Sequence, residues 1–220
     1  LAFSINRVDI YCNHDITVLN NCTPSEMFKC ARLSDKDIPE LMLFHDTHCV
    51  QWNHCFSNQD VKQRLKNNHR CFIAKNPNNE IIGFFWQGAN NVYSPDLHCV
   101  FYVDDKSLID YNGFFHPEFR GRSGLFNILQ YAYNKMAEDG FKKAYGYIRS
   151  DNIASIKTYQ RIHPLCKIVG KIYYGYVLGY YVFIPLIDKD SGIRVERVIN
   201  PWYKWHNLLL QFLGKKKAVM

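Results

Sequence analysis

A glycine-containing loop in the middle of the chain joins two segments of different periodicity. Residues 107–115 (SLIDYNGFF) have the composition of a β-strand, and apolar residues recur at helical spacing from Gly124, at Leu125, Ile128, Leu129, Ala132 and Met136. Gly140 follows the last turn of this pattern as a C-terminal stop. A strand that passes through a short loop into an amphipathic helix predicts a mixed sheet with helices between its strands.

Other segments fit the same architecture. Residues 27–33 predict a strand, and Ser34 and Asp37 have the capping-box spacing of a helix that follows within residues 33–52. The sequence NPNN at 76–79 separates two apolar runs and predicts a β-hairpin. We also expect a strand at 144–148, a helix at 152–162 capped by Ser150 or Asp151, and a strand pair at 166–187 that turns near Leu178.

The length and composition favour one principal core. With 220 residues, 47% of them hydrophobic, we expect a domain at 26–187 with extensions at 1–25 and 188–220. The eight cysteines form no CxxC pair, which favours a reduced, cytoplasmic protein. Residues 172–187 carry no charge, but this run is shorter than the ~20 residues of a membrane-spanning helix.

The net charge of +7 favours anionic partners. The lysines and arginines are scattered along the chain except for Lys215, Lys216 and Lys217, and no basic stripe indicates nucleic acid. A small molecule that carries phosphate is therefore the first expectation.

The loop after the central strand predicts a phosphate cradle. The first turn of a helix leaves backbone N–H groups unbonded, and glycines let the loop approach a ligand closely. Arginines at 120 and 122 add positive charge. The alternative is a solvated turn, because short glycine motifs often occur by chance.

Two segments, FFHPEFRGRSGLF and RSDNIASIKTYQRI, together resemble the GNAT superfamily of acyl-CoA-dependent N-acetyltransferases. The resemblance covers residues 26–187 and implies an α/β (α+β) fold: a mixed, mostly antiparallel central sheet flanked by helices. It also implies a splay between the fourth and fifth family strands, here 108–115 and 143–148. Ser123 and Leu125 depart from the family loop, which usually has glycine or alanine there.

The same resemblance implies where acetyl-CoA binds. Its pantetheine arm would pair with strand backbone, its diphosphate would lie on the loop amides, and the helix after the next strand would complete the groove. The residues implied are Phe114, Phe115, Arg120, Gly121, Arg122, Ser123, Gly124, Leu125, Asn152 and Ser155.

Two residues are implied as proton carriers. Tyr159 follows Asn152 and Ser155 on one helical face and is assigned as the donor to the departing thiolate, with packing under the sheet as its alternative role. Asp110 is assigned as the base, with a water chain as the alternative. Strict strand alternation would place Asp110 with Asn112 and Phe114 on one face.

Two further segments carry chemistry-bearing side chains. HDTHCVQWNHC contains His45, His48, Cys49, His54 and Cys55, but it lacks zinc-motif spacing, so no metal is expected. The pattern fits a pocket wall and a core-facing stripe equally well. The segment WYKWHNLLLQFLGKKK predicts an amphipathic helix that docks on its own domain or a partner subunit, more readily than on a membrane. A monomer or a homodimer is expected.

These observations favour an N-acetyltransferase that moves an acetyl group from acetyl-CoA to the primary amine of a small molecule, such as a nucleotide-linked amino sugar. Two alternatives stay open at this point. One is a CoA-binding sensor or interaction module without catalysis, and the other is an acyltransferase that uses a longer acyl donor.

Overall fold

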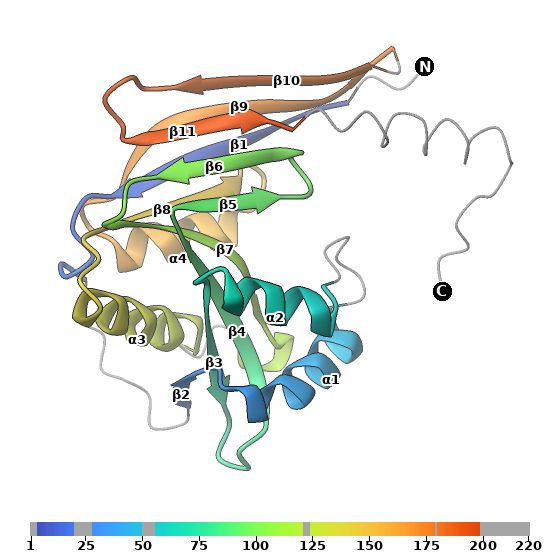
Figure 1. Cartoon of the computed structure of the whole chain (residues 1–220), viewed down its shortest axis with the longest axis vertical. Coiled ribbons are helices and arrows are strands. Elements are labelled where there is room, and N and C mark those ends of the chain that lie inside the picture. Colours follow the sequence, from blue (N-terminus) through green and yellow to red (C-terminus); the bar gives the residue numbers. More distant parts are fainter. Residues whose placement is uncertain (1–3, 20–27, 50–55, 121–123, 179, 199–220) are drawn as a thin grey trace, which may run out of the picture.

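The computed structural model describes residues 4–19, 28–49, 56–120, 124–178 and 180–198 (Figure 1). The strands form an eight-stranded sheet in the order β10-β9-β1-β8-β7-β4-β3-β2 and a three-stranded sheet in the order β11-β6-β5. The strands are β1 (Ser4–Asn13), β2 (Lys29–Arg32), β3 (Arg70–Lys75), β4 (Ile81–Ala89), β5 (Asn91–Ser94), β6 (Cys99–Val103), β7 (Ser107–Phe115), β8 (Lys143–Arg149), β9 (Lys167–Val177), β10 (Tyr180–Ile187) and β11 (Ile193–Arg197).

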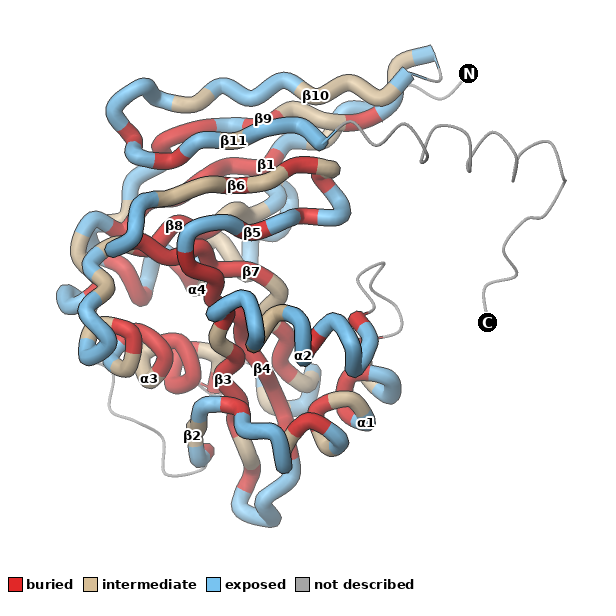
Figure 2. The backbone as a smooth tube through the Cα atoms, in the orientation of Figure 1, coloured by how far each residue is buried: buried red, intermediate tan, exposed pale blue. Residues whose placement is uncertain are grey.

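Helices cover both faces of the large sheet. They are α1 (Ile38–His48), α2 (Asn58–Lys66), α3 (Gly124–Glu138) and α4 (Ile153–Ile162), with 3₁₀ turns η1 (Asp35–Asp37) and η2 (Pro117–Phe119). One core cluster packs α1, α2 and the three-stranded sheet on one face, and a second packs α3 and α4 on the other. Every residue of β4 is buried, as the continuous red strand in Figure 2 shows. The predicted mixed sheet flanked by helices is confirmed.

The pairing of β7 and β8 opens the large sheet. They are the parallel pair, whereas the other described neighbours in both sheets are antiparallel. Their register runs from Ser107 opposite Lys143 to Asp110 opposite Gly146 and then stops, although β7 continues to Phe115. The two strands therefore separate beyond Asp110, at the position of the predicted splay.

The strand–loop–helix unit forms largely as its periodicity predicts. The strand covers 107–115 and α3 begins at Gly124, and Gly140 follows α3 with a φ of 93°. The capping box at the start of the first helical segment is present, since Asp37 accepts from the backbone N–H of Ser34 at 3.1 Å. The cap of α4 is Asn152, however, and neither Ser150 nor Asp151, because the Asn152 side chain accepts from the Ser155 backbone N–H.

The sheets use more of the chain than domain boundaries at 26 and 187 anticipate. β1 lies inside the large sheet between β8 and β9, and β11 pairs with β6. The second half of β1 is buried at every position from Val8 to Asn13. Buried and exposed positions therefore do not alternate there as they do in a half-buried strand.

The uncharged stretch near the C-terminus forms the hairpin of β9 and β10, as expected. Among the described residues, no helix combines the length and the apolar character needed to cross a membrane. The segment predicted to form the C-terminal amphipathic helix lies outside the described residues.

Candidate active site

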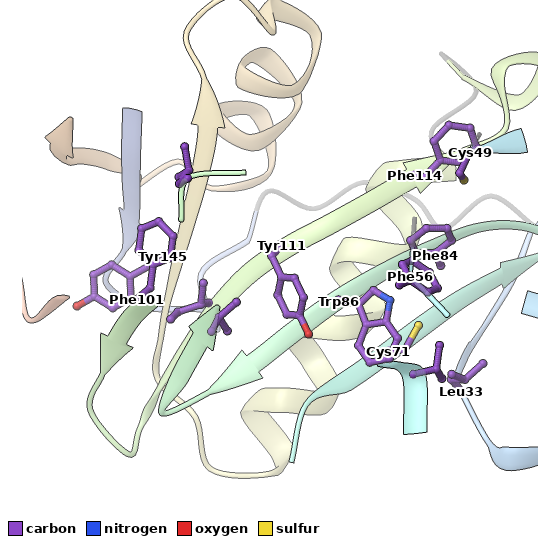
Figure 3. Packing of buried hydrophobic residues seen from close by; sticks show 14 of the residues in the cluster. Leu33, Cys49, Phe56, Cys71, Phe84, Trp86, Phe101, Tyr111, Phe114 and Tyr145 are labelled. Carbon is purple, nitrogen blue, oxygen red and sulfur yellow. The ribbon is translucent and has the colours of Figure 1, made fainter. Parts of the chain in front are cut away.

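A cavity of about 250 Å³ lies where β7 and β8 separate. Residues from both faces of the large sheet line it, because the gap between the strands connects the two faces. His45 and Phe56 come from the side of α1 and α2, and Leu125 and Leu129 come from α3 on the other side. On the side of α1 and α2, the rings of Phe56 and Phe84 form an aromatic wall of the cavity (Figure 3). Their ring centroids lie 5.6 Å apart.

Asp110 lies at the point where the strands part, and it is one of the residues that line the cavity. It is buried and accepts hydrogen bonds from the Tyr133 hydroxyl and, at 2.8 Å, from Gln87 Nε2. Burial raises the pKa of Asp110 to about 7, although the bonds from Tyr133 and Gln87 oppose this shift. A carboxyl group with this pKa exchanges protons near neutral pH.

A β-bulge changes the expected alternation of β7. Phe84 and Trp86 of β4 oppose Phe114 and Tyr111, so two residues of β7 stand opposite one residue of β4. Asn112 adopts a φ of 47° within this bulge. The prediction that Asp110 and Phe114 share one face is therefore wrong: Asp110 bonds Tyr133 of α3, whereas Phe114 packs at 5.9 Å on Phe44 of α1.

Tyr159 reaches the same cavity from α4. Its ring packs against Gly146, the residue of β8 that pairs with Asp110. The hydroxyl is buried and makes no hydrogen bond with any residue that the structure describes. Burial, followed by the nearby charge of Asp110, raises the pKa of Tyr159 well above its ordinary value of 10. Tyr159 therefore stays protonated at neutral pH and can serve as a donor.

The start of α4 contributes two more of the predicted residues. Asn152 and Ser155 both line the cavity, together with Thr158 one helical turn further along. The side-chain oxygen of Asn152 accepts from the Ser155 N–H at 3.2 Å, which fixes the first turn of the helix. Both predicted residues thus lie on the wall that also carries Tyr159.

The predicted cradle residues take different positions. Phe114 and Leu125 line the cavity, whereas Phe115 does not and instead fills the core against Gly83 and Gly124. Arg120 donates through Nε to the Phe115 carbonyl oxygen at 2.9 Å, and its guanidinium lies 5.3 Å from the Phe114 ring centroid. Residues 121–123, which include Gly121, Arg122 and Ser123, lie outside the described residues.

Sequence reasoning missed the groups that hold Asp110. Gln87 stands in a strand that is otherwise apolar or small, and such a polar residue in a buried strand is a usable signal of a buried network. Tyr133 gave no comparable signal, since an aromatic residue on the buried face of an amphipathic helix is ordinary. His163 packs between the two tyrosines, with both ring-centroid distances at 4.5 Å.

The histidine-rich segment forms part of the aromatic wall. His45 is buried against Phe56 at a ring-centroid distance of 4.0 Å and lines the cavity with Cys49. His48 packs instead on His116. No metal-binding group of three His, Cys, Asp or Glu residues occurs in the part of the chain that the structure describes. His54 and Cys55 lie outside that part.

Comparisons with known proteins agree with this architecture. A family model described as the acetyltransferase (GNAT) family matches residues 39–163, which is more than half of the chain. No curated protein matches the sequence.

Three solved structures show the same fold at low sequence identity. An aminoglycoside acetyltransferase from an uncultured soil metagenomic sample has a TM-score of 0.51 at 15% identity, over 74% of this chain and 99% of that one. The glucosamine N-acetyltransferase region of a fungal multi-domain β-N-acetylglucosaminidase gives 0.52 at 13%, over 76% and 20%. A protein assigned to the GNAT family from Novosphingobium aromaticivorans gives 0.54 at 10%, over 77% and 63%.

Proposed function

Because the chain belongs to the GNAT family of acetyltransferases, we propose that it moves an acetyl group from acetyl-CoA to the primary amine of a small molecule. The observation that carries this proposal is the cavity between β7 and β8, which brings Asp110 together with the Tyr159 hydroxyl, a group that has no hydrogen-bond partner among the described residues. Acetyl-CoA, the donor that this family uses, supplies the activated acetyl group as a thioester.

The opening of the sheet provides a place for the pantetheine arm. Beyond Asp110, β7 has no pairing partner on the side of β8 among the described residues, so its backbone can bond the amides of an extended ligand. The diphosphate would lie at the start of α3, where Gly124 brings the helix against the end of β7 and the first backbone N–H groups have no helical acceptor.

The two proton carriers suit acyl transfer. A neutral amine that attacks a thioester must lose a proton, and the departing thiolate must gain one. Asp110 would take the proton from the amine nitrogen, and Tyr159 would donate its hydroxyl proton to the sulfur. Since Asp110 and Tyr159 influence each other's pKa, transfer of the proton from the carboxyl to the phenolate would restore both groups.

The shape of the site and the activities of proteins with a similar fold both support the proposed acceptor class. The cavity is mostly lined by apolar and aromatic groups with a few polar ones, which suits a small molecule. Two of the structures similar to this chain are an aminoglycoside acetyltransferase and a glucosamine N-acetyltransferase region. Amino sugars, including nucleotide-linked ones, are therefore the first acceptors to test. We propose the cytoplasm as the location.

Thiol release from acetyl-CoA tests this function directly. The full chain is mixed with acetyl-CoA and, in turn, with amino sugars, polyamines, amino acids and peptides. We expect at least one amine to produce free thiol, with an acetylated product identified by mass. The opposite outcome, in which acetyl-CoA raises the melting temperature but no amine releases thiol, would favour a CoA-binding module without catalysis.

A further inference from the structure

A tyrosine of α3 contacts Asp110 from the core of the protein. The Tyr133 hydroxyl donates to Asp110 Oδ2, while Gln87 Nε2 donates to the other carboxylate oxygen, Oδ1, at 2.8 Å. Tyr133 is fully buried and is not one of the residues that line the cavity. It therefore reaches the carboxylate without contact with a substrate in the cavity.

Tyr159 reaches the same carboxylate from α4. A Cβ atom at Gly146 would lie 3.3 Å from the Tyr159 hydroxyl oxygen, and Gly146 is the β8 residue that pairs with Asp110. Burial and the charge of Asp110 raise the pKa of Tyr159, and the Tyr133 hydroxyl is near enough to oppose this rise. The oxygen atoms of Asp110, Tyr133 and Tyr159 thus form one buried cluster.

The ring of His163 fixes the positions of the two tyrosines. It packs edge-on against Tyr133, at an interplanar angle of 83°, and tilted against Tyr159, at 57°. Asn13 Oδ1 accepts from the Asp15 N–H at 3.4 Å, so Asn13 Nδ2 is the donor to His163 Nδ1 at 2.7 Å. Burial lowers the pKa of His163 to about 3. The ring is therefore neutral near pH 7, with its hydrogen on Nε2, and takes up no proton itself.

We propose that Tyr133 passes the proton between Asp110 and Tyr159 during acetyl transfer. This inference rests on the proposed function, in which Asp110 takes a proton from the amine and Tyr159 gives one to the sulfur. Tyr133 acts through these two residues and touches neither substrate, so it is a positioning residue. The Tyr159 hydroxyl has no hydrogen-bond partner in the described part of the chain, which leaves its oxygen able to accept from Tyr133.

The relay balances in protons. Once Asp110 carries the amine proton, its O–H donates to the Tyr133 oxygen and the Tyr133 hydroxyl hydrogen turns toward Tyr159. The O–H bond of Asp110 and the original O–H bond of Tyr133 then break, and new O–H bonds form on Tyr133 and Tyr159. Asp110 ends as a carboxylate and both tyrosines end as phenols. The transfer is favourable because the Tyr159 phenolate is a stronger base than the carboxylate.

Loss of the Tyr133 hydroxyl tests the relay. We expect Tyr133→Phe to lower kcat about tenfold, less than loss of the acid itself, with KM and stabilisation by acetyl-CoA unchanged. Asp110 also loses a donor that lowers its pKa, so the midpoint of the rise in kcat/KM should move above about pH 7. Tyr131→Phe, on the same helix with its ring centroid 6.1 Å from that of Phe72, is the control and should change neither quantity.

A second variant separates the relay from simple support of Asp110. Gln87→Met removes the other donor to the carboxylate, so it should move the midpoint in the same direction. Gln87 makes no bond to either tyrosine in the described part of the chain. At a pH above both midpoints, the plateau kcat of Tyr133→Phe should therefore lie about tenfold below that of Gln87→Met.

Other ionisable groups near Asp110 are common to these variants. Tyr159 of α4 and Cys166 after α4 face it, in addition to Tyr133. Further ionisable residues line the cavity or lie beside it: His45, Asp96, Arg149 and Arg64, whose guanidinium lies 5.3 Å from the Tyr111 ring centroid. Because these groups are unchanged, a difference between Tyr133→Phe and the wild type reports the missing hydroxyl.

Unfolding measures the same contact without catalysis. A higher folded pKa of Asp110 means that more stabilisation is lost as the pH rises, so the free energy of unfolding should fall further between about pH 5 and about pH 8 in Tyr133→Phe than in the wild type. Equal pH dependence of unfolding, an undiminished kcat in Tyr133→Phe, or equal plateaus in Tyr133→Phe and Gln87→Met would each overturn the relay alone. Absence of thiol release by the wild type with every amine would instead reject the proposed function, and the relay with it.

Discussion

At the scale of single residues, two neighbouring side chains have opposite tasks in the proposed reaction. Asp110 and Tyr159 are both buried, both line the cavity, and both have raised pKa values. For a carboxyl group, this shift creates a proton acceptor that works near neutral pH. For a phenol, it preserves a proton donor.

Removing the Tyr159 hydroxyl should slow the reaction without removing acetyl-CoA. We expect Tyr159→Phe to lower kcat by ~10²-fold or more, because the thiolate loses its acid, while stabilisation by acetyl-CoA is unchanged. Tyr131→Phe, a half-buried tyrosine on α3, is the matched control and should keep full activity. Undiminished thiol release by Tyr159→Phe would remove this residue from the mechanism.

The raised pKa of Asp110 also predicts how stability depends on pH. Burial raises the pKa from its ordinary 3.8 to about 7, so the folded chain binds this proton more tightly than the unfolded chain. The resulting stabilisation is complete below the ordinary pKa and is lost as the pH rises through the folded value. Urea denaturation at about pH 5 and about pH 8 should show a larger loss of free energy in the wild type than in Asp110→Asn.

Catalysis by Asp110 should follow the same ionisation in the opposite direction. The base must be ionised to accept a proton, so kcat/KM should rise with pH through about 7.

Equal pH dependence of the free energy of unfolding in the wild type and Asp110→Asn would contradict the argument that burial raises the pKa of Asp110. A flat pH profile of kcat/KM would contradict only the assignment of Asp110 as base.

At the scale of secondary-structure elements, the junction between β7 and α3 connects the two parts of the proposed acetyl-CoA site, which are the edge of β7 and the start of α3. Gly124 begins α3, and a side chain at this position would overlap the ring of Phe115 at the end of β7. Close packing of the helix on the strand therefore requires glycine here.

Substitution of Gly124 should separate the strand from the helix. We expect Gly124→Ala to lower the free energy of unfolding by ~1–3 kcal/mol, because either Phe115 or α3 must move, and to weaken stabilisation by acetyl-CoA. Asn134→Ala, on the exposed side of α3, should change neither quantity. Urea denaturation and thermal shift measure both effects, and a Gly124→Ala variant that matches the wild type would show that this packing is unimportant.

Local patterns in the sequence predicted the elements that alternate or repeat clearly. The apolar spacing of α3, the turn between β3 and β4 and the strand β7 were all readable from the sequence. The bulge at Asn112 was not, because it depends on how β4 pairs with β7, and a local pattern carries no information on register. The Asp110–Tyr133–Gln87 network escaped prediction for the same reason, since three separate elements form it.

At the scale of the whole molecule, the N-terminal strand connects the hairpin of β9 and β10 to the other strands of the large sheet. β1 pairs with β8 on one side and with β9 on the other, so β9 and β10 reach the rest of the sheet through it. The hairpin of β9 and β10 also contributes Tyr174 to the lining of the cavity. The Tyr181 hydroxyl of the same hairpin donates to the Leu97 carbonyl oxygen in the turn between β5 and β6. The site therefore depends on residues far from the GNAT motif.

This position of β1 predicts a steep dependence on burial along one strand. Ile10→Ala should lower the free energy of unfolding by ~2–5 kcal/mol, because Ile10 is fully buried. Ile5→Ala, at a position 41% exposed on the same strand, should cost less than ~1 kcal/mol. Similar small losses for both variants in urea denaturation would show that β1 packs only as an appendage.

We propose that acetyl-CoA occupies the gap between β7 and β8, with its sulfur beside Tyr159. A crystal structure of the full chain with coenzyme A tests this most directly. We expect pantetheine density along residues 111–115 of β7, with the thiol next to the Tyr159 hydroxyl and the diphosphate at the start of α3. Coenzyme bound elsewhere, or a β7–β8 gap filled by side chains in the complex, would contradict it.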